Sequence, residues 1–149
     1  FTANSELVFN YVLQKDENGN LIRYFKEPEE YNIEILNHGS GPAKELRIHL
    51  YLQSDSLINY KHPTGDIGWK KWHYSNEPDY PYSLSYQIDR SAIVFILDVT
   101  ESIPVKINYH YFQAYNLKIK FINAILKVYF GEPEPLIVPF KIIFKEMAG

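Results

Sequence analysis

Cysteine is absent from this chain of 149 residues. Its absence excludes disulfide bonds, thiolate metal sites and a cysteine nucleophile, and it leaves the cellular compartment open. No apolar run approaches the roughly 18 residues of a membrane-spanning helix, and no basic segment followed by an apolar one marks a secretory signal. Because the chain begins at Phe1 without an initiator Met, we expect a mature or excised fragment, with any membrane anchor lying outside it.

A strong excess of either charge is also absent. Lys and Arg number 15 against 18 Asp and Glu, which gives a net charge of −3 and a pI near 6.0. Basic residues are scattered singly apart from Lys70-Lys71, so the sequence lacks an electrostatic footprint for nucleic acid and we expect no nucleic-acid partner. Hydrophobic residues make up 46% of the chain, which argues against disorder, and the length predicts one domain over residues 1–149.

What the sequence does contain is hydrophobic alternation with a period of two, clearest over residues 31–53. In the first strand of this stretch one face carries Tyr31, Ile33 and Ile35. In the second strand one face carries Leu46, Ile48, Leu50 and Leu52, and the other carries Arg47, His49, Tyr51 and Gln53. We expect the aliphatic face to form the core and the other face to be exposed to water.

The loop between these two strands contains Asn37, Gly39, Gly41, Pro42 and Ala43. We expect positive φ at the two glycines and a hydrogen bond from the asparagine side chain to the turn backbone. With its flanking strands, this segment resembles the immunoglobulin-like β-sandwiches of the bacterial and archaeal cell-adhesion-related type. It is also similar to small sandwich domains that follow N-terminal membrane helices in many prokaryotic proteins. The resemblance implies an immunoglobulin-like fold, an extracytoplasmic or membrane-anchored setting, and no catalytic residue.

The remaining alternating segments extend the all-β prediction to nine strands. They are Glu6–Gln14, Leu21–Lys26, Tyr82–Ile88, Ala92–Val99, Val105–Ala114, Leu117–Phe130 and Leu136–Lys145. Asn18-Gly19 predicts a tight hairpin between the first two strands. A calcium loop at the same place is disfavoured, because the glycine stands at the fourth position rather than the sixth.

Two details qualify these strands. The doublets Phe121-Ile122 and Ile125-Leu126 predict either a bulge near Asn123 or a break in the strand. Pro139 cannot donate a ladder hydrogen bond, so it predicts that the last strand lies at a sheet edge or bends.

The long connection from Ser54 to Pro81 is the candidate functional region. It contains or adjoins the aromatic residues that we select as the candidate ligand-binding or partner-binding site: Trp69, Trp72, Tyr74, Tyr80 and Tyr82. Long loops in compact domains are often functional, and aromatic rings can anchor a protein partner or stack on sugars. The alternative is that these rings fold down and close one end of the sandwich as a satellite core.

No metal, cofactor or catalytic site is expected. The five histidines, His38, His49, His62, His73 and His110, lack metal-ligand spacing. Nucleophile-elbow, phosphate-loop, dinucleotide and zinc-protease motifs are missing, and Asp66 with Asp79 forms a carboxylate pair only in sequence.

The sequence therefore predicts a single immunoglobulin-like antiparallel β-sandwich of about seven to nine strands with one long aromatic loop. The predicted function is a non-enzymatic interaction or structural module that recognises a protein partner through its loops. One alternative is a module that binds carbohydrate or another small ligand with the aromatic loop. A second is a surface subunit that self-associates by strand addition.

Overall fold

The computed structural model describes residues 2–28, 30–53, 68–72, 77, 79–80, 82–87, 95–108 and 117–148, with only the backbone for 68–72, 82, 87 and 95. The described residues form strands and turns and contain no helix, which confirms the all-β prediction. The strands are β1 (Ser5–Lys15), β2 (Leu21–Phe25), β3 (Glu30–Leu36), β4 (Ala43–Leu52), β5 (Gly68–Trp72), β6 (Tyr82–Gln87), β7 (Phe95–Leu97), β8 (Ser102–Asn108), β9 (Phe121–Phe130) and β10 (Leu136–Glu146). Each predicted strand has a counterpart, and β5 is additional.

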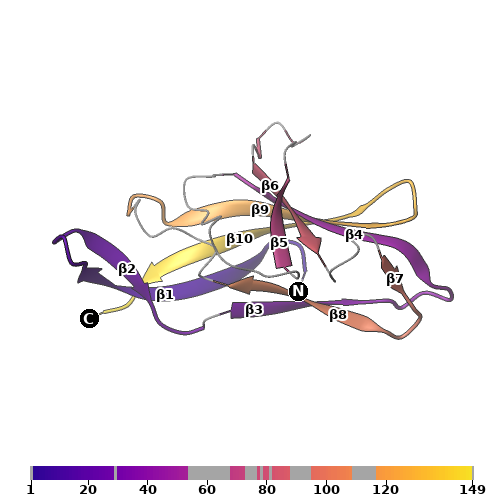
Figure 1. Ribbon diagram of the computed structural model, residues 1–149, viewed down its shortest axis with the longest axis horizontal. Coiled ribbons are helices and arrows are strands. Elements are labelled where there is room, and N and C mark those ends of the chain that lie inside the picture. The colour runs from indigo at the N-terminus through magenta and orange to yellow at the C-terminus, as the bar shows by residue number, and fades with distance from the viewer. Residues whose placement is uncertain are drawn as a thin grey trace.

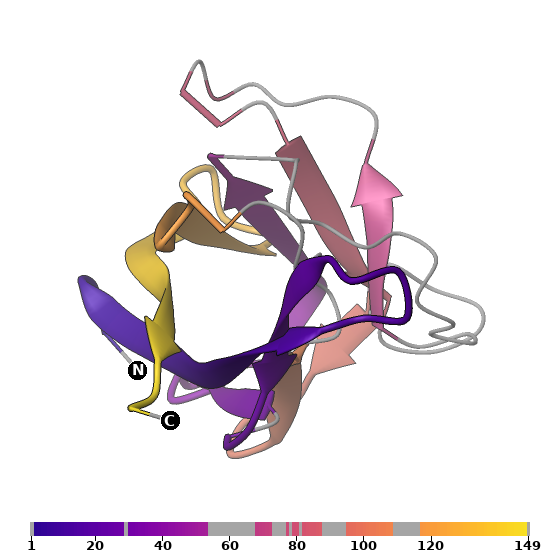
Figure 2. The same cartoon turned by 90° about the vertical axis from the view of Figure 1, so that its left-hand side faces the viewer.

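Eight strands form one sheet in the order β2-β1-β10-β9-β4-β6-β5, with β7 paired to the start of β4 (Figure 1). Strands β3 and β8 form a separate two-stranded antiparallel sheet. Viewed along its length, the larger sheet curls round, and β3 and β8 close the opposite side (Figure 2). The result is a sandwich with a barrel-like curl.

The β1–β10 pair runs parallel, which departs from the predicted fully antiparallel sandwich. Ser5–Tyr11 lies in register with Phe140–Glu146. These are the first and last strands, so no short turn constrains their relative direction. The pairing also places β10 between β1 and β9, so of the two alternatives predicted from Pro139 the edge strand is wrong.

Proline is tolerated in this inner strand because of its position in the ladder. The Phe144 nitrogen donates to the Lys120 carbonyl oxygen at 2.8 Å, so the even-numbered residues of β10 form the hydrogen-bonded pairs with β9. Pro139, opposite Ile125, needs no N–H on that side. On the other side pairing with β1 begins only at Phe140, and the Pro139 carbonyl oxygen accepts from the Asn4 nitrogen at 2.7 Å.

The core lies between the two sheets and follows the predicted alternation. Ile33 and the four predicted aliphatic residues of β4 are buried. In β9 the buried residues are Ile122, Ala124, Leu126 and Val128, and the register is continuous with both neighbouring strands. A bulge near Asn123 is therefore not formed; the strand instead breaks before Phe121, where residues 117–120 form a turn.

Specific polar contacts fasten the sheets and their ends. The Tyr31 hydroxyl of β3 accepts from the Val8 nitrogen at 3.1 Å and donates to the Val8 oxygen at 2.7 Å. Arg23 of β2 is buried, with its guanidinium carbon 4.8 Å from the ring centre of Tyr11. Its guanidinium also donates to the carbonyl oxygens of Leu117 and Ile119. These bonds hold the 117–120 turn against the barrel end.

The two predicted turns, at Asn18-Gly19 and at Asn37–Gly41, are formed. The Asp16 carboxylate accepts from the nitrogens of Asn18 and Asn20, each at 2.9 Å, so its oxygen serves its own hairpin turn. The Asn37 side chain donates to the Gly41 and Leu97 oxygens and accepts from the Gly39 nitrogen at 2.8 Å, as predicted.

Among the described glycines positive φ occurs at Gly19 and Gly131 but not at Gly39 or Gly41. The expectation of positive φ at the two loop glycines is therefore wrong. At position 39 a close contact explains why the residue is glycine, because a Cβ there would lie 3.1 Å from the Asn37 side-chain oxygen. No comparable contact surrounds Gly41.

Candidate functional site

The structure places the predicted aromatic residues in different settings. Trp69 and Trp72 belong to strand β5, so their assignment to a loop is wrong. They lie in register with Tyr86 and Ser83 of β6, at the end of the strand order of the larger sheet. The other three predicted residues are distributed as follows: Tyr82 is the first residue of β6, Tyr80 is half-buried in the segment before it, and Tyr74 lies outside the described residues.

The outer face of β4 beside these strands is covered at His49 and Tyr51, which corrects the prediction of exposure for these two residues, whereas Arg47 and Gln53 on the same face are exposed as predicted. His49 and Tyr51 are 7% and 4% exposed. By register they share this face with Lys127 and Ile125 of β9 and with Ser85 and Ser83 of β6. Both serines are also buried.

Charged and aromatic groups pack together on this covered face. The Lys127 ammonium forms an ion pair with Glu77 and lies 5.1 Å from the ring centre of Tyr51. The Arg47 guanidinium lies 5.4 Å from the ring centre of Tyr129, whose ring meets His49 edge-on at 5.4 Å. The ion pair with Lys127 holds Glu77, which precedes β6, against this face of the sheet.

The covered face controls the ionisation of its buried groups. Burial, reinforced by the Arg47 and Lys127 charges, lowers the pKa of His49, so the neutral imidazole is favoured. Burial, with the neighbouring Tyr129 hydroxyl and the Glu77 carboxylate, raises the pKa of Tyr51 above its usual range. Both pKa shifts favour the uncharged forms of these two side chains, as expected for groups packed in a covered layer.

An apolar cavity opens at one end of the sandwich. It has a volume of about 200 Å³ and lies between the end of β3, the start of β4, and the ends of β9 and β10 that their loop connects. The side chains of Leu36, Phe130 and Leu136 line it and are 44%, 36% and 55% exposed. Asn37 and His38 are its polar lining. Sequence reasoning missed this cavity because its walls come from five separate strands, including Leu97 of β7.

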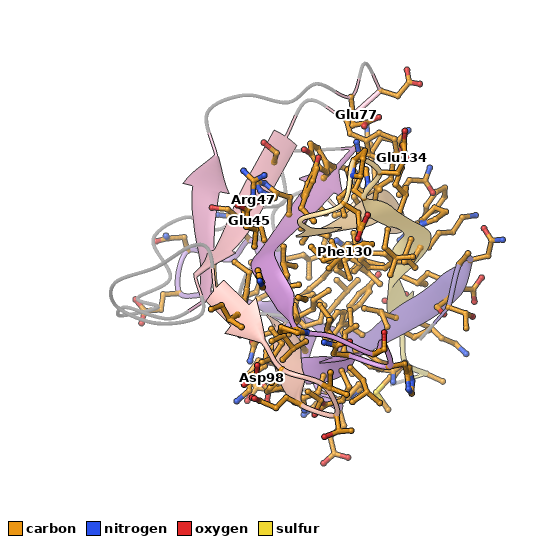
Figure 3. The ribbon with its side chains drawn as sticks, turned by 90° about the vertical axis from the view of Figure 1, so that its right-hand side faces the viewer. Glu45, Arg47, Glu77, Asp98, Phe130 and Glu134 are labelled. Atoms are coloured by element: carbon orange, nitrogen blue, oxygen red, sulfur yellow. The ribbon has the colours of Figure 1, made fainter. Side chains whose placement is uncertain are left out.

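Several carboxylates lie on this side of the molecule. Figure 3, which views this side, labels Glu45, Asp98 and Glu134 together with Phe130, and shows Arg47 next to Glu45. A hydrogen bond with Asp98 raises the pKa of the exposed Glu101 carboxyl. The end therefore combines exposed apolar side chains with several carboxylates and with the exposed cations Lys44 and Arg47.

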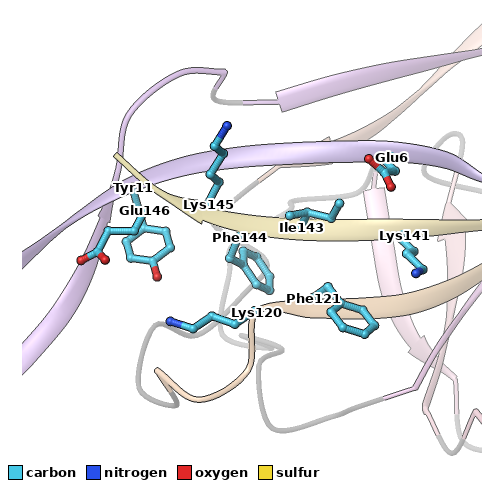
Figure 4. A pocket seen from close by; sticks show the side chains of 9 residues that line it. All are labelled: Glu6, Tyr11, Lys120, Phe121, Lys141, Ile143, Phe144, Lys145 and Glu146. Carbon is cyan, nitrogen blue, oxygen red and sulfur yellow. The ribbon is translucent and has the colours of Figure 1, made fainter. Parts of the chain in front are cut away.

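A second cavity, of about 390 Å³, lies on the outer face of β1, β10 and β9 (Figure 4). Its lining includes Phe121, Ile143 and Phe144, with Lys120 and Lys141 on either side of Phe121. The Lys141 ammonium lies 4.9 Å from the centre of the Phe121 ring. Because the residues come from positions that the sheet register aligns, Ile143 opposite Phe121 and Lys141 opposite Glu6, this cavity too was invisible to local sequence motifs.

No three His, Asp or Glu side chains of the described residues gather as a metal-binding group. His62, His73, His110 and Asp66 lie outside those residues. The part of the chain that the structure describes also contains no helix long and apolar enough to span a membrane. Comparison with protein-family models, with curated proteins and with solved structures found no match to the chain.

Proposed function

We propose that this protein is a non-enzymatic interaction module that presents the open end of a rigid β-sandwich to a protein partner. The observation that carries the proposal is the cavity at this end, where Leu36, Phe130 and Leu136 are each more than one-third exposed. Contiguous exposed apolar side chains with a polar rim are typical of recognition surfaces. Such a surface can receive an apolar side chain of the partner while the charged side chains around it select the partner's charge.

The chemistry of the lining favours binding over bond making. Apart from Asn37 and His38 the lining is aliphatic or aromatic, and the Asn37 amide serves the loop itself. A lining of this kind recognises shape and apolar surface. The scaffold is well suited to this role because the cavity walls are strands whose register the core fixes.

The strand order supports the finer proposal of an immunoglobulin-like fold. In that fold strands B and E pair in one sheet, and C, F and G lie side by side in the other. Here β3 pairs with β8, and β4, β9 and β10 are adjacent in that order. The extracytoplasmic or membrane-anchored setting rests on the resemblance of the loop around Asn37 and remains a prediction.

A binding experiment with matched leucine substitutions tests the proposal. The parent protein, Leu136→Ser and Leu21→Ser would be immobilised and exposed to proteins of the source cell, and the retained proteins quantified by mass spectrometry. Leu136 and Leu21 are similarly exposed, at 55% and 48%, but only Leu136 lines the end cavity. We expect a partner that the parent and Leu21→Ser retain and that Leu136→Ser loses. Retention that does not distinguish the three proteins would contradict the proposal.

The alternative of a module that binds carbohydrate or another small ligand rests on the predicted aromatic residues Trp69, Trp72, Tyr74, Tyr80 and Tyr82. A glycan array with the parent protein tests it directly, since specific retention of a sugar would favour that alternative.

A further inference from the structure

The loop between β9 and β10 forms a projecting acidic tip that we call the knob, residues 130–136 (Figure 1). Its sequence is Phe-Gly-Glu-Pro-Glu-Pro-Leu. Exposed Phe130 and Leu136 flank the exposed carboxylates of Glu132 and Glu134. Two prolines restrict the backbone between them, so little conformational entropy remains to be lost when the knob binds.

The outer-face cavity of Figure 4, which we call the basic pocket, has the complementary properties. Its floor contains the exposed ring of Phe121 and the side chain of Ile143. Lys120, Lys141 and Lys145 line it, against Glu6 and Glu146. A pocket with an apolar floor and more cations than carboxylates suits an acidic segment that carries apolar side chains.

The knob and the basic pocket lie at opposite ends of one β-hairpin. Phe121 and Phe130 are the first and last residues of β9. At about 3.3 Å per residue this strand separates them by roughly 30 Å, so a knob cannot enter the basic pocket of its own molecule.

We propose that the knob of one copy of this chain docks into the basic pocket of a second copy. Phe130 and Leu136 then meet the apolar floor, and Glu132 and Glu134 approach Lys120 and Lys141. Because the two surfaces differ, the contact is heterologous and adds further copies head to tail unless the rotation closes a ring. This inference rests on the proposed function and deepens it by naming the partner as the same protein.

The contact is small, so self-association is expected to be weak and sensitive to salt. Interfaces at the low end of the size range form transient complexes, and we expect the average mass to rise between about 10 μM and about 1 mM protein. Exposed charge pairs are screened as the Debye length falls from about 10 Å at 0.1 M salt to about 3 Å at 1 M. Sedimentation equilibrium of the parent at low and high salt measures both dependences. A parent that remains monomeric over this range at low salt would overturn the inference.

Reciprocal charge reversal identifies the two surfaces. One variant carries Glu132→Lys with Glu134→Lys, and the other carries Lys120→Glu with Lys141→Glu. Each variant alone brings like charges together, and we expect self-association at least about 10-fold weaker than that of the parent. In an equimolar mixture each knob finds an oppositely charged pocket, so association should return. All four side chains are exposed, and unfolding curves that superimpose on the parent's establish that the folds are intact.

A control with the same change in net charge as the knob variant is Glu17→Lys with Glu34→Lys, at exposed positions outside the knob and the basic pocket. It should self-associate as the parent does. Variants that associate alone as strongly as the parent, or a mixture that stays dissociated, would refute the docking geometry. The proposed function is tested separately, because a parent that stays monomeric but still retains a partner through Leu136 refutes only the self-association. A parent that does neither refutes both.

Discussion

The Tyr31 hydroxyl is the most direct test of how the two sheets are held together. It makes two hydrogen bonds to the backbone of Val8, at 3.1 Å to the nitrogen and 2.7 Å to the oxygen. Val8 lies in the part of β1 that pairs with β10 on one side, whereas pairing with β2 begins only at Tyr11. The tyrosine hydroxyl thus takes the place of a neighbouring strand at this residue. Tyr31→Phe would remove both bonds and retain the ring.

The structure allows the cost to be estimated. Each hydrogen bond contributes about 1 kcal/mol net, so losing two should lower the free energy of unfolding by about 2 kcal/mol. The ring would still pack edge-on against Phe9, with ring centres 5.3 Å apart, so no cavity term is added. For a protein of this size the loss corresponds to a fall in Tm of about 4–8 °C.

Urea unfolding followed by circular dichroism measures the effect. Tyr24→Phe is the matched control, because Tyr24 is 50% exposed and its hydroxyl can be solvated in the folded protein. We expect the control to unfold with the parent. A Tyr31→Phe protein whose unfolding midpoint equals that of the control would show that water satisfies Val8 equally well, and would refute the role assigned to this hydroxyl.

Three further predictions follow from residues described above. The pKa of His49 is lowered in the folded state, so the unfolded chain binds a proton on this side chain at a higher pH than the folded protein does. The free energy of unfolding therefore decreases as the pH drops from about 6.5 through the lower folded-state pKa. Relative to the parent, His49→Gln should show a shallower loss of stability in urea titrations between pH 7.5 and 5.0, and identical slopes would be evidence against it. Gly131→Ala should destabilise by about 1 kcal/mol because φ is +87°, whereas Gly41→Ala, with ordinary φ and open space, should be neutral or slightly stabilising; equal unfolding midpoints would contradict this. If Trp69 and Trp72 contact a ligand or partner, Trp69→Ala with Trp72→Ala should abolish that binding with little loss of stability, whereas a loss of several kcal/mol in thermal unfolding would assign both rings to the core.

Local patterning was sufficient to predict most of the strands because alternation directly reflects which side chains face the core. The four aliphatic residues of β4 and the turn at Asn18-Gly19 are examples in which propensity and packing agree. Strand β5 was missed because Gly68–Trp72 has adjacent lysines instead of alternation and lies between segments rich in glycine and proline. Its strand state depends on pairing with β6, which the local sequence does not encode.

The errors at the candidate site share a physical cause. Alternation identifies one buried face of a strand, but the burial of His49 and Tyr51 on the other face depends on whether a distant segment covers it. Glu77 is held on this face by an ion pair with Lys127, fifty residues away. The basic pocket similarly depends on the register that brings Lys141 beside Phe121. Long-range register, rather than residue type, determines both features.

The parallel alignment of β1 and β10 also determines how the protein would respond to tension. Parallel neighbours start at the same end of the sheet, so the chain enters β1 at one end and leaves β10 at the other. A stretching force applied through the two flanking segments would slide the strands past one another. It would strain the ladder over all seven register pairs, from Ser5 with Phe140 to Tyr11 with Glu146, at the same time. An antiparallel terminal pair would instead open one bond after another, so chain direction alone gives this sandwich a shear geometry between its ends.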